Sequence, residues 1–322
     1  MNENRSHFTL HGKSPILQLV IALIIAFFIG GAIFVVMFIA GLLFSGIDLG
    51  IMSDNSFADI IEQNIMFVRY LLAIQTISFL LIPAIIIRKL LLPDNSKSLN
   101  DFARPKFNEI AIVVLLAFCI LPVNGITGEI NAAMKFPEWL SGVEEWMKLK
   151  EDEAAELIGL LIPSDSAGFM LNIFIIAILP AISEELFFRG VLQRIFYGFF
   201  KSPHTAIWFT AILFSATHLQ FYGFVPRLIL GLSFGYLYYW GRTLWLPVIA
   251  HFVNNATAVA VEYYTGADTN TSPEHAEDWA NIIVLSVFVF LILVILLYFR
   301  NKFNQERITV TKVVITDDYA QV

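Results

Sequence analysis

Long runs without charge constrain the fold of this chain more than any other feature. From Ser14 to Ile47 there is no acidic or basic residue, whereas a helix of about 20 apolar residues already crosses the hydrocarbon core of a bilayer. The run is also far longer than the apolar part of a cleavable signal peptide. With 57% hydrophobic and only 15% charged residues in a chain of 322, the sequence is typical of a multi-pass integral membrane protein that lies in the lipid bilayer.

Similar runs predict an all-α transmembrane bundle of about eight spans. The expected spans are Ile16–Phe44, Phe67–Ile87, Ile110–Ile126, Gly168–Phe200, Thr205–Phe221, Arg227–Trp240, Leu246–Tyr264 and Trp279–Phe299. We therefore divide the chain into an N-terminal segment (1–15), a transmembrane domain (16–299) and a tail (300–322). The segment 308–316, in which every residue except Lys312 is β-branched, predicts a short strand or disorder in the tail.

Lysine and arginine positions predict the orientation. The segment 88–109 holds five basic residues and the tail begins with Arg300 and Lys302, whereas residues 48–62 are acidic with no basic residue. Because cytoplasmic loops are enriched in Lys and Arg, both termini are expected in the cytoplasm. The long loop 123–167 then lies outside. From Pro137 its apolar residues recur at helical spacing, which predicts an amphipathic helix on the outer membrane face.

The composition gives little support to a disulfide, a cysteine-based zinc site or a nucleic-acid-binding site. Cys119 is the single cysteine, which excludes an intrachain disulfide and a cysteine-based zinc site. No basic patch is present, so we expect no nucleic-acid partner.

Three charged residues lie within one seven-residue stretch of the expected fourth span, Ser183 to Arg189. A charge at the centre of a span costs roughly 2.5–3.5 kcal/mol, so Glu184, Glu185 and Arg189 indicate a functional site or an ion-pair cluster that fixes helix packing. Glu185 and Arg189 are four residues apart and can pair on one helix face, while Glu184 is rotated by about 100°. Glu184 therefore remains free unless another helix supplies a partner.

Two histidines and an asparagine in later spans are candidate partners. These are His218, His251 and Asn255. Counting about 1.5 Å per residue from the turn near Ser202 brings Glu184 and His218 to one depth. His251 and Asn255 reach this depth if the fourth and fifth helices project roughly 10 Å beyond the bilayer. Such a site would open towards the cytoplasm.

The chemistry that these groups support is hydrolysis of an amide bond. Glu184 could act as a general base on water. His218 and His251 could bind a divalent metal such as zinc or donate to an oxyanion, and Asn255 could donate to the oxyanion or orient His251. The H-E-x-x-H pattern of single-helix metalloproteases is absent, so glutamate-activated water is better supported than a metal.

Three motifs together resemble a known family. They occur in order as Glu184-Glu185-x-x-x-Arg189, Phe214-x-x-x-His218 and His251-x-x-x-Asn255. They are similar to the signature of the CPBP family, the CAAX-protease and bacteriocin-processing (Abi) membrane proteins, over roughly Leu179 to Ala260, within an expected protease core at 168–264.

The resemblance implies an intramembrane endopeptidase entered from the cytoplasmic side, in a bacterial plasma membrane, with a peptide or membrane protein as its substrate. It also implies that Glu184 activates water, that His218, His251 and Asn255 complete the site, and that Glu185 and Arg189 support it. Metal-dependent and glutamate-only mechanisms both stay open. Some relatives act in bacteriocin immunity or as scaffolds.

The residues also bear on two other hypotheses about function. Gly231 to Gly235 fits G-x-S-x-G, but that motif needs a strand-to-helix turn, so we interpret it as a small-residue packing face. A proton- or ion-coupled transporter would also use intramembrane Glu, Arg and His, yet it predicts broken helices in two related halves. The polar cluster lies only in the second half. We therefore predict an endopeptidase, with a transporter or a non-catalytic scaffold or immunity protein as the alternatives.

Overall fold

The computed structural model is entirely helical where it describes the chain. It describes residues 10, 12–46, 64–91, 101–134, 136–162, 165–265 and 279–319, and within these ranges there is no strand. The side chains of 279–281 and 303–319 are outside the description. The predicted all-α fold class is confirmed, and the acidic segment 48–62 that supported the orientation lies outside the described residues.

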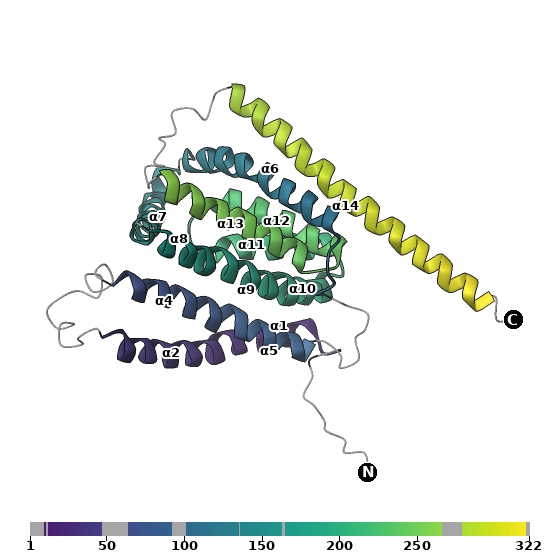
Figure 1. The fold of residues 1–322 in the computed structure, drawn as a ribbon, viewed down its shortest axis with the longest axis horizontal. Helices are drawn as coiled ribbons and strands as arrows, with labels where there is room; N and C mark the ends of the chain where they lie inside the picture. Colours follow the sequence, from purple (N-terminus) through teal and green to yellow (C-terminus); the bar gives the residue numbers. More distant parts are fainter. Residues whose placement is uncertain are drawn as a thin grey trace, which may run out of the picture.

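The helices follow one another with several π-helical turns. In chain order they are α1 (Pro15–Ile24), η1 (Ile25–Ile29), α2 (Gly30–Ser45), α4 (Ile65–Thr76), η3 (Ile77–Leu81), α5 (Ile82–Leu91), α6 (Phe107–Ala132), η4 (Glu138–Leu140), α7 (Ser141–Leu161), α8 (Ser166–Asn172), η5 (Ile173–Ile178), α9 (Leu179–Phe187), η6 (Phe188–Leu192), α10 (Gln193–Phe200), α11 (Pro203–Ala216), α12 (Phe224–Gly241), α13 (Trp245–Thr265) and α14 (Trp279–Tyr319). The segment from α8 to α10 forms one continuous rod (Figure 1).

The rod lies between two groups of helices. On one side are α1, α2, α4 and α5, and on the other α11, α12 and α13, with α6 and α14 beyond them (Figure 1). One apolar core joins α1, α5, the rod and α11, and a second joins α6, α12, α13 and α14. The rod belongs to the first core and α13 to the second, so polar side chains between these helices lie between the two cores.

Five helical segments are long and apolar enough to cross a membrane, among the described residues. They are Pro15–Ser45, Ile65–Leu91, Phe107–Ala132, Ser166–Phe200 and Ile282–Lys302. Helices α11, α12 and α13 occupy the remaining expected spans. The protein is an integral membrane protein, and the count of eight spans stays a prediction.

Three expected segments differ in detail or extent. Helix α11 ends at Ala216, not Phe221, so His218 lies in the turn before α12. Helix α14 continues to Tyr319, so the predicted strand or disorder at 308–316 was wrong. Helix α7 covers 141–161 of the long loop, which confirms a helix there, while its place on the outer membrane face stays a prediction.

Two glycines allow α11 and α12 to approach closely. A Cβ atom on Gly235 would lie 2.7 Å from Cγ2 of Ile207, and one on Gly231 would lie 3.0 Å from the backbone Cα of Ala211. Gly231 and Gly235 therefore form the predicted small-residue packing face.

The buried carboxylate of Asp101 joins several helices of the bundle. Asp101, only 2% exposed, accepts hydrogen bonds from Arg88 of α5 and Arg194 of α10. The hydroxyl of Tyr238 in α12 donates to the same carboxylate at 3.1 Å. Asp101 thus joins three helices at a point outside the polar cluster of the second half.

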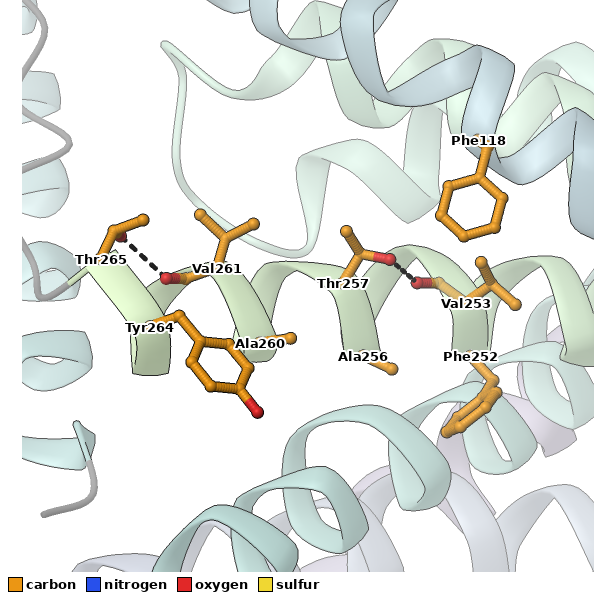
Figure 2. A pocket seen from close by; sticks show the side chains of 9 residues that line it. All are labelled: Phe118, Phe252, Val253, Ala256, Thr257, Ala260, Val261, Tyr264 and Thr265. Carbon is orange, nitrogen blue, oxygen red and sulfur yellow. Dashed lines mark hydrogen bonds between the residues drawn. The ribbon is translucent and has the colours of Figure 1, made fainter. Parts of the chain in front are cut away.

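An apolar groove of about 480 Å³ follows α13 and is bordered by Phe118 of α6. Figure 2 shows its α13 side chains, which run from Phe252 to Thr265. At 100° per residue they lie on the face of α13 away from His251 and Asn255. The groove is therefore separate from the predicted site.

Candidate active site

An ion pair inside the rod forms the base of the site. Arg189 Nη1 donates to Glu185 Oε1 at 2.8 Å, and both side chains are fully buried. Arg189 Nη2 donates to the carbonyl oxygen of Gly231 at 2.9 Å, and its guanidinium lies 4.9 Å from the ring centre of Phe214. The i,i+4 pairing expected from the sequence is therefore present, and it also ties the rod to α11 and α12.

Glu185 orients the imidazole of His251. The Nδ1 atom of His251 lies 2.8 Å from Glu185 Oε1, and because a carboxylate only accepts hydrogen bonds, Nδ1 carries the proton. His251 is 4% exposed and stacks on Phe234 at 5.2 Å between ring centres. Its other nitrogen, Nε2, lies 3.9 Å from Glu184 Oε2. Glu185 therefore fixes the tautomer and the direction of the ring, as carboxylate partners of catalytic histidines do.

Glu184 has the free carboxylate. Its Oε2 atom is buried and has no hydrogen-bond partner among the described residues, and its side chain is 14% exposed. Buried polar atoms are almost always hydrogen-bonded, so an exception needs an explanation. A water or substrate group between Glu184 and His251 would provide the missing partner.

His218 approaches from the turn after α11. Its Nδ1 lies 2.8 Å from the carbonyl oxygen of Phe214, so Nδ1 carries the proton and Nε2 is left free. The imidazole is exposed and lies within electrostatic range of Glu184 and His251. The structure thus brings His218 to the same region as Glu184 and His251.

Asn255 forms a hydrogen bond with the backbone of the rod. Its Nδ2 donates to the carbonyl oxygen of Ile176 at 3.1 Å. Pro180, four residues after Ile176, has no N–H for the regular helical bond to that carbonyl. Asn255 therefore ties α13 to the rod, at a level about 12 Å along the helix from Glu184. Its role towards an oxyanion stays a prediction.

Residues 166–257 match the family model described as Type II CAAX prenyl endopeptidase Rce1-like. This segment is therefore similar to the Rce1-like family. The Rce1-like segment begins with α8 and includes every predicted site residue, so the family resemblance drawn from the three motifs is confirmed.

Part of the chain is also similar to a curated relative. The chain is 26% identical over 110 residues to the uncharacterized protein YpbD of Bacillus subtilis (strain 168). The match covers 33% of this chain and 53% of YpbD, so the chain spans about half the length of this curated relative. No solved structure matches the chain.

The Rce1-like segment contains donor types that suit a metal but not in a suitable arrangement. The free Nε2 atoms of His218 and His251 and the carboxylate of Glu184 are ligands that zinc accepts. In the described part of the chain, however, no three His, Cys, Asp or Glu side chains are gathered closely enough to hold an ion. The described residues therefore do not gather three such side chains into a metal centre, and metal binding by His218 and His251 stays a prediction.

One residue of the Rce1-like segment was missed as a contributor in its own right. The ring of Phe214 lies 5.2 Å from the ring of His218 and 5.9 Å from that of His251, besides covering Arg189. Its carbonyl also fixes the tautomer of His218. The signal was present, because Phe214 begins the Phe-x-x-x-His motif, but an apolar residue in a span is most often interpreted as packing.

Proposed function

We propose that this protein is an intramembrane endopeptidase in which Glu184 activates the attacking water. The Rce1-like family match supports a CAAX-protease-like peptidase at the level of the family. The observation that supports the mechanism is the unpartnered carboxylate oxygen of Glu184, 3.9 Å from the oriented imidazole of His251.

In the proposed reaction Glu184 takes a proton from water while the water oxygen attacks the carbonyl carbon of the scissile amide. The new C–O bond gives a tetrahedral oxyanion. Glu184 then passes its proton to the leaving nitrogen as the C–N bond breaks. His251 and His218 would stabilise the oxyanion, and Glu185 with Arg189 would hold His251 in place.

The substrate is proposed as a peptide or a membrane protein cut near the lipid. Purified protein should be assayed against quenched peptides with and without a prenyl group, in the presence and absence of a chelator. We expect cleavage by the wild type and none by Glu184→Gln. Cleavage by that variant at the wild-type rate would refute the role of Glu184, and a wild type that cleaves no peptide would refute the peptidase.

The proposal also concerns the side of the membrane from which a substrate reaches the site. We infer a plasma-membrane location with both termini in the cytoplasm from the distribution of Lys and Arg. Helix α7, which we expect outside, packs on the turn that carries His218, since the ring centres of Trp146 and Phe221 are 5.3 Å apart. A substrate that enters past His218 would then come from outside, contrary to the cytoplasmic opening that we expect.

Labelling can decide between the two routes. Cysteines placed at exposed positions of α7 should react with an impermeant maleimide in intact cells if α7 is outside. The buried Cys119 gives little background. Reaction only after cell lysis would reverse the orientation and restore a cytoplasmic entrance past His218.

A further inference from the structure

The turn Thr217–Gly223 is the least regular element that carries a predicted site residue. His218 lies in it, and the next residue, Leu219, has a positive φ of 55°. A non-glycine residue in this left-handed region costs free energy and persists only where the surroundings impose it. The position of His218 therefore depends on what holds the turn.

Two helices hold the turn besides those it connects. From α6, Asn131 Nδ2 donates to the carbonyl oxygen of Phe221 at 2.6 Å. From α7, the ring of Trp146 packs against that of Phe221. The carboxyl of Glu151, whose buried Oε2 has no hydrogen-bond partner among the described residues, lies near enough to the backbone N–H of Tyr222 for that group to lower its pKa.

Charge reinforces the contact between α7 and the turn. Glu151 lies within electrostatic range of Arg227 in the first turn of α12, and Arg227 in turn donates to the carbonyl oxygen of Gln220 at 3.2 Å. Burial raises the pKa of Glu151, while the charge of Arg227 and the N–H of Tyr222 lower it. Glu151 thus faces both the turn and the cation that holds it.

We propose that α7 positions His218 for catalysis, with Trp146 and Glu151 as positioning residues. The bond to Phe214 fixes the tautomer of the imidazole, but the contacts from α7 fix the backbone from which the side chain extends. This inference rests on the proposed function, in which His218 takes part in the reaction. It gives the long loop between α6 and α8 a role in the site that neither the motifs nor the family match assigns.

The test compares variants of α7 in the full-length protein. Trp146→Ala and Glu151→Ala should lower kcat, by up to about 100-fold if the imidazole moves by 1 Å, and should leave KM nearly unchanged. Trp146→Phe keeps a ring against Phe221 and should restore most of kcat. Trp139→Ala is the matched control, because Trp139 lies on the same loop and is 80% exposed.

Two readouts separate positioning from general damage. Hydrogen–deuterium exchange should increase in the peptide that contains the turn and stay unchanged in α9 and α13. In a His218→Ala background, Glu151→Ala should cause little further loss of activity, because the two changes act on one group.

Unchanged exchange at the turn, or unchanged kcat despite faster exchange, would overturn the proposal. Independent, additive losses in the double variant would also overturn it. A wild type without peptidase activity would instead refute the proposed function, and this inference with it.

Discussion

The two adjacent glutamates should respond in opposite ways to the same substitution. Glu185 accepts hydrogen bonds from Arg189 and His251, each at 2.8 Å, and both Glu185 and Arg189 are fully buried. Glu184 Oε2 has no such partner among the described residues. A change to glutamine keeps the size of each side chain and removes only its charge.

The expected changes in stability and activity follow from the surroundings of the two carboxylates. Glu185→Gln leaves the charge of Arg189 buried without a counter-ion, and removal of one partner of a buried pair costs about 3–5 kcal/mol. Glu184→Gln removes a partly buried charge that has no hydrogen bond, so stability should stay unchanged or increase, as is common when a functional group is lost. Cleavage should be abolished by Glu184→Gln.

Thermal unfolding in detergent, followed by tryptophan fluorescence, measures the difference. The midpoint should fall for Glu185→Gln and should not fall for Glu184→Gln. Arg189→Gln is the matched control, since it breaks the same pair from the other side and should resemble Glu185→Gln. Equal destabilisation by both glutamate variants, or wild-type stability of Glu185→Gln, would refute this assignment of the two carboxylates.

Other substitutions test the helix contacts around the site. Asn255→Ala should lower the unfolding midpoint, because the carbonyl of Ile176 loses its hydrogen-bond partner, which costs about 1–3 kcal/mol of stability. A loss of kcat in the variant that remains folded would show a separate role of Asn255 towards the oxyanion. Gly235→Ala should cost about 1–3 kcal/mol by overpacking against Ile207, whereas Gly125→Ala, whose Cβ would meet nothing within 4 Å, should be tolerated. Asp101→Asn should lower stability by a comparable 3–5 kcal/mol, with kcat of the folded protein retained.

The sequence predicts the rod and its ion pair well because both depend on local spacing. The hydrophobic run that ends near Phe200 needs only the length rule for spans, and the pair of Glu185 and Arg189 needs only the 3.6-residue period of a helix. Depth counting brought Glu184 and His218 to one level, and His251 to the same depth only if the fourth and fifth helices project beyond the bilayer. The structure places Nε2 of His251 3.9 Å from Oε2 of Glu184.

Features set by contacts between helices were not predictable in the same way. The expected fifth span continues past Ala216 with two apolar residues, Leu219 and Phe221, so hydropathy alone did not show that α11 ends before His218. The bond from Asn255 to the carbonyl of Ile176 depends on Pro180 together with a partner on α13. The charged pattern of α7 predicted a helix, but nothing in it indicated that Glu151 would face the turn.

The tautomers of the two histidines separate the roles that the residues alone left open. Both Nδ1 protons are used, one by Glu185 and one by the carbonyl of Phe214, so both Nε2 atoms present lone pairs. A metal ligand needs this state, but the described residues gather no third ligand around the two rings. An oxyanion donor needs a second proton on the ring. Carboxylates face both nitrogens of His251, with Glu185 Oε1 2.8 Å from Nδ1 and Glu184 Oε2 3.9 Å from Nε2. We therefore propose His251 as the donor to the oxyanion, with Glu184 as the base once water or substrate separates the two side chains.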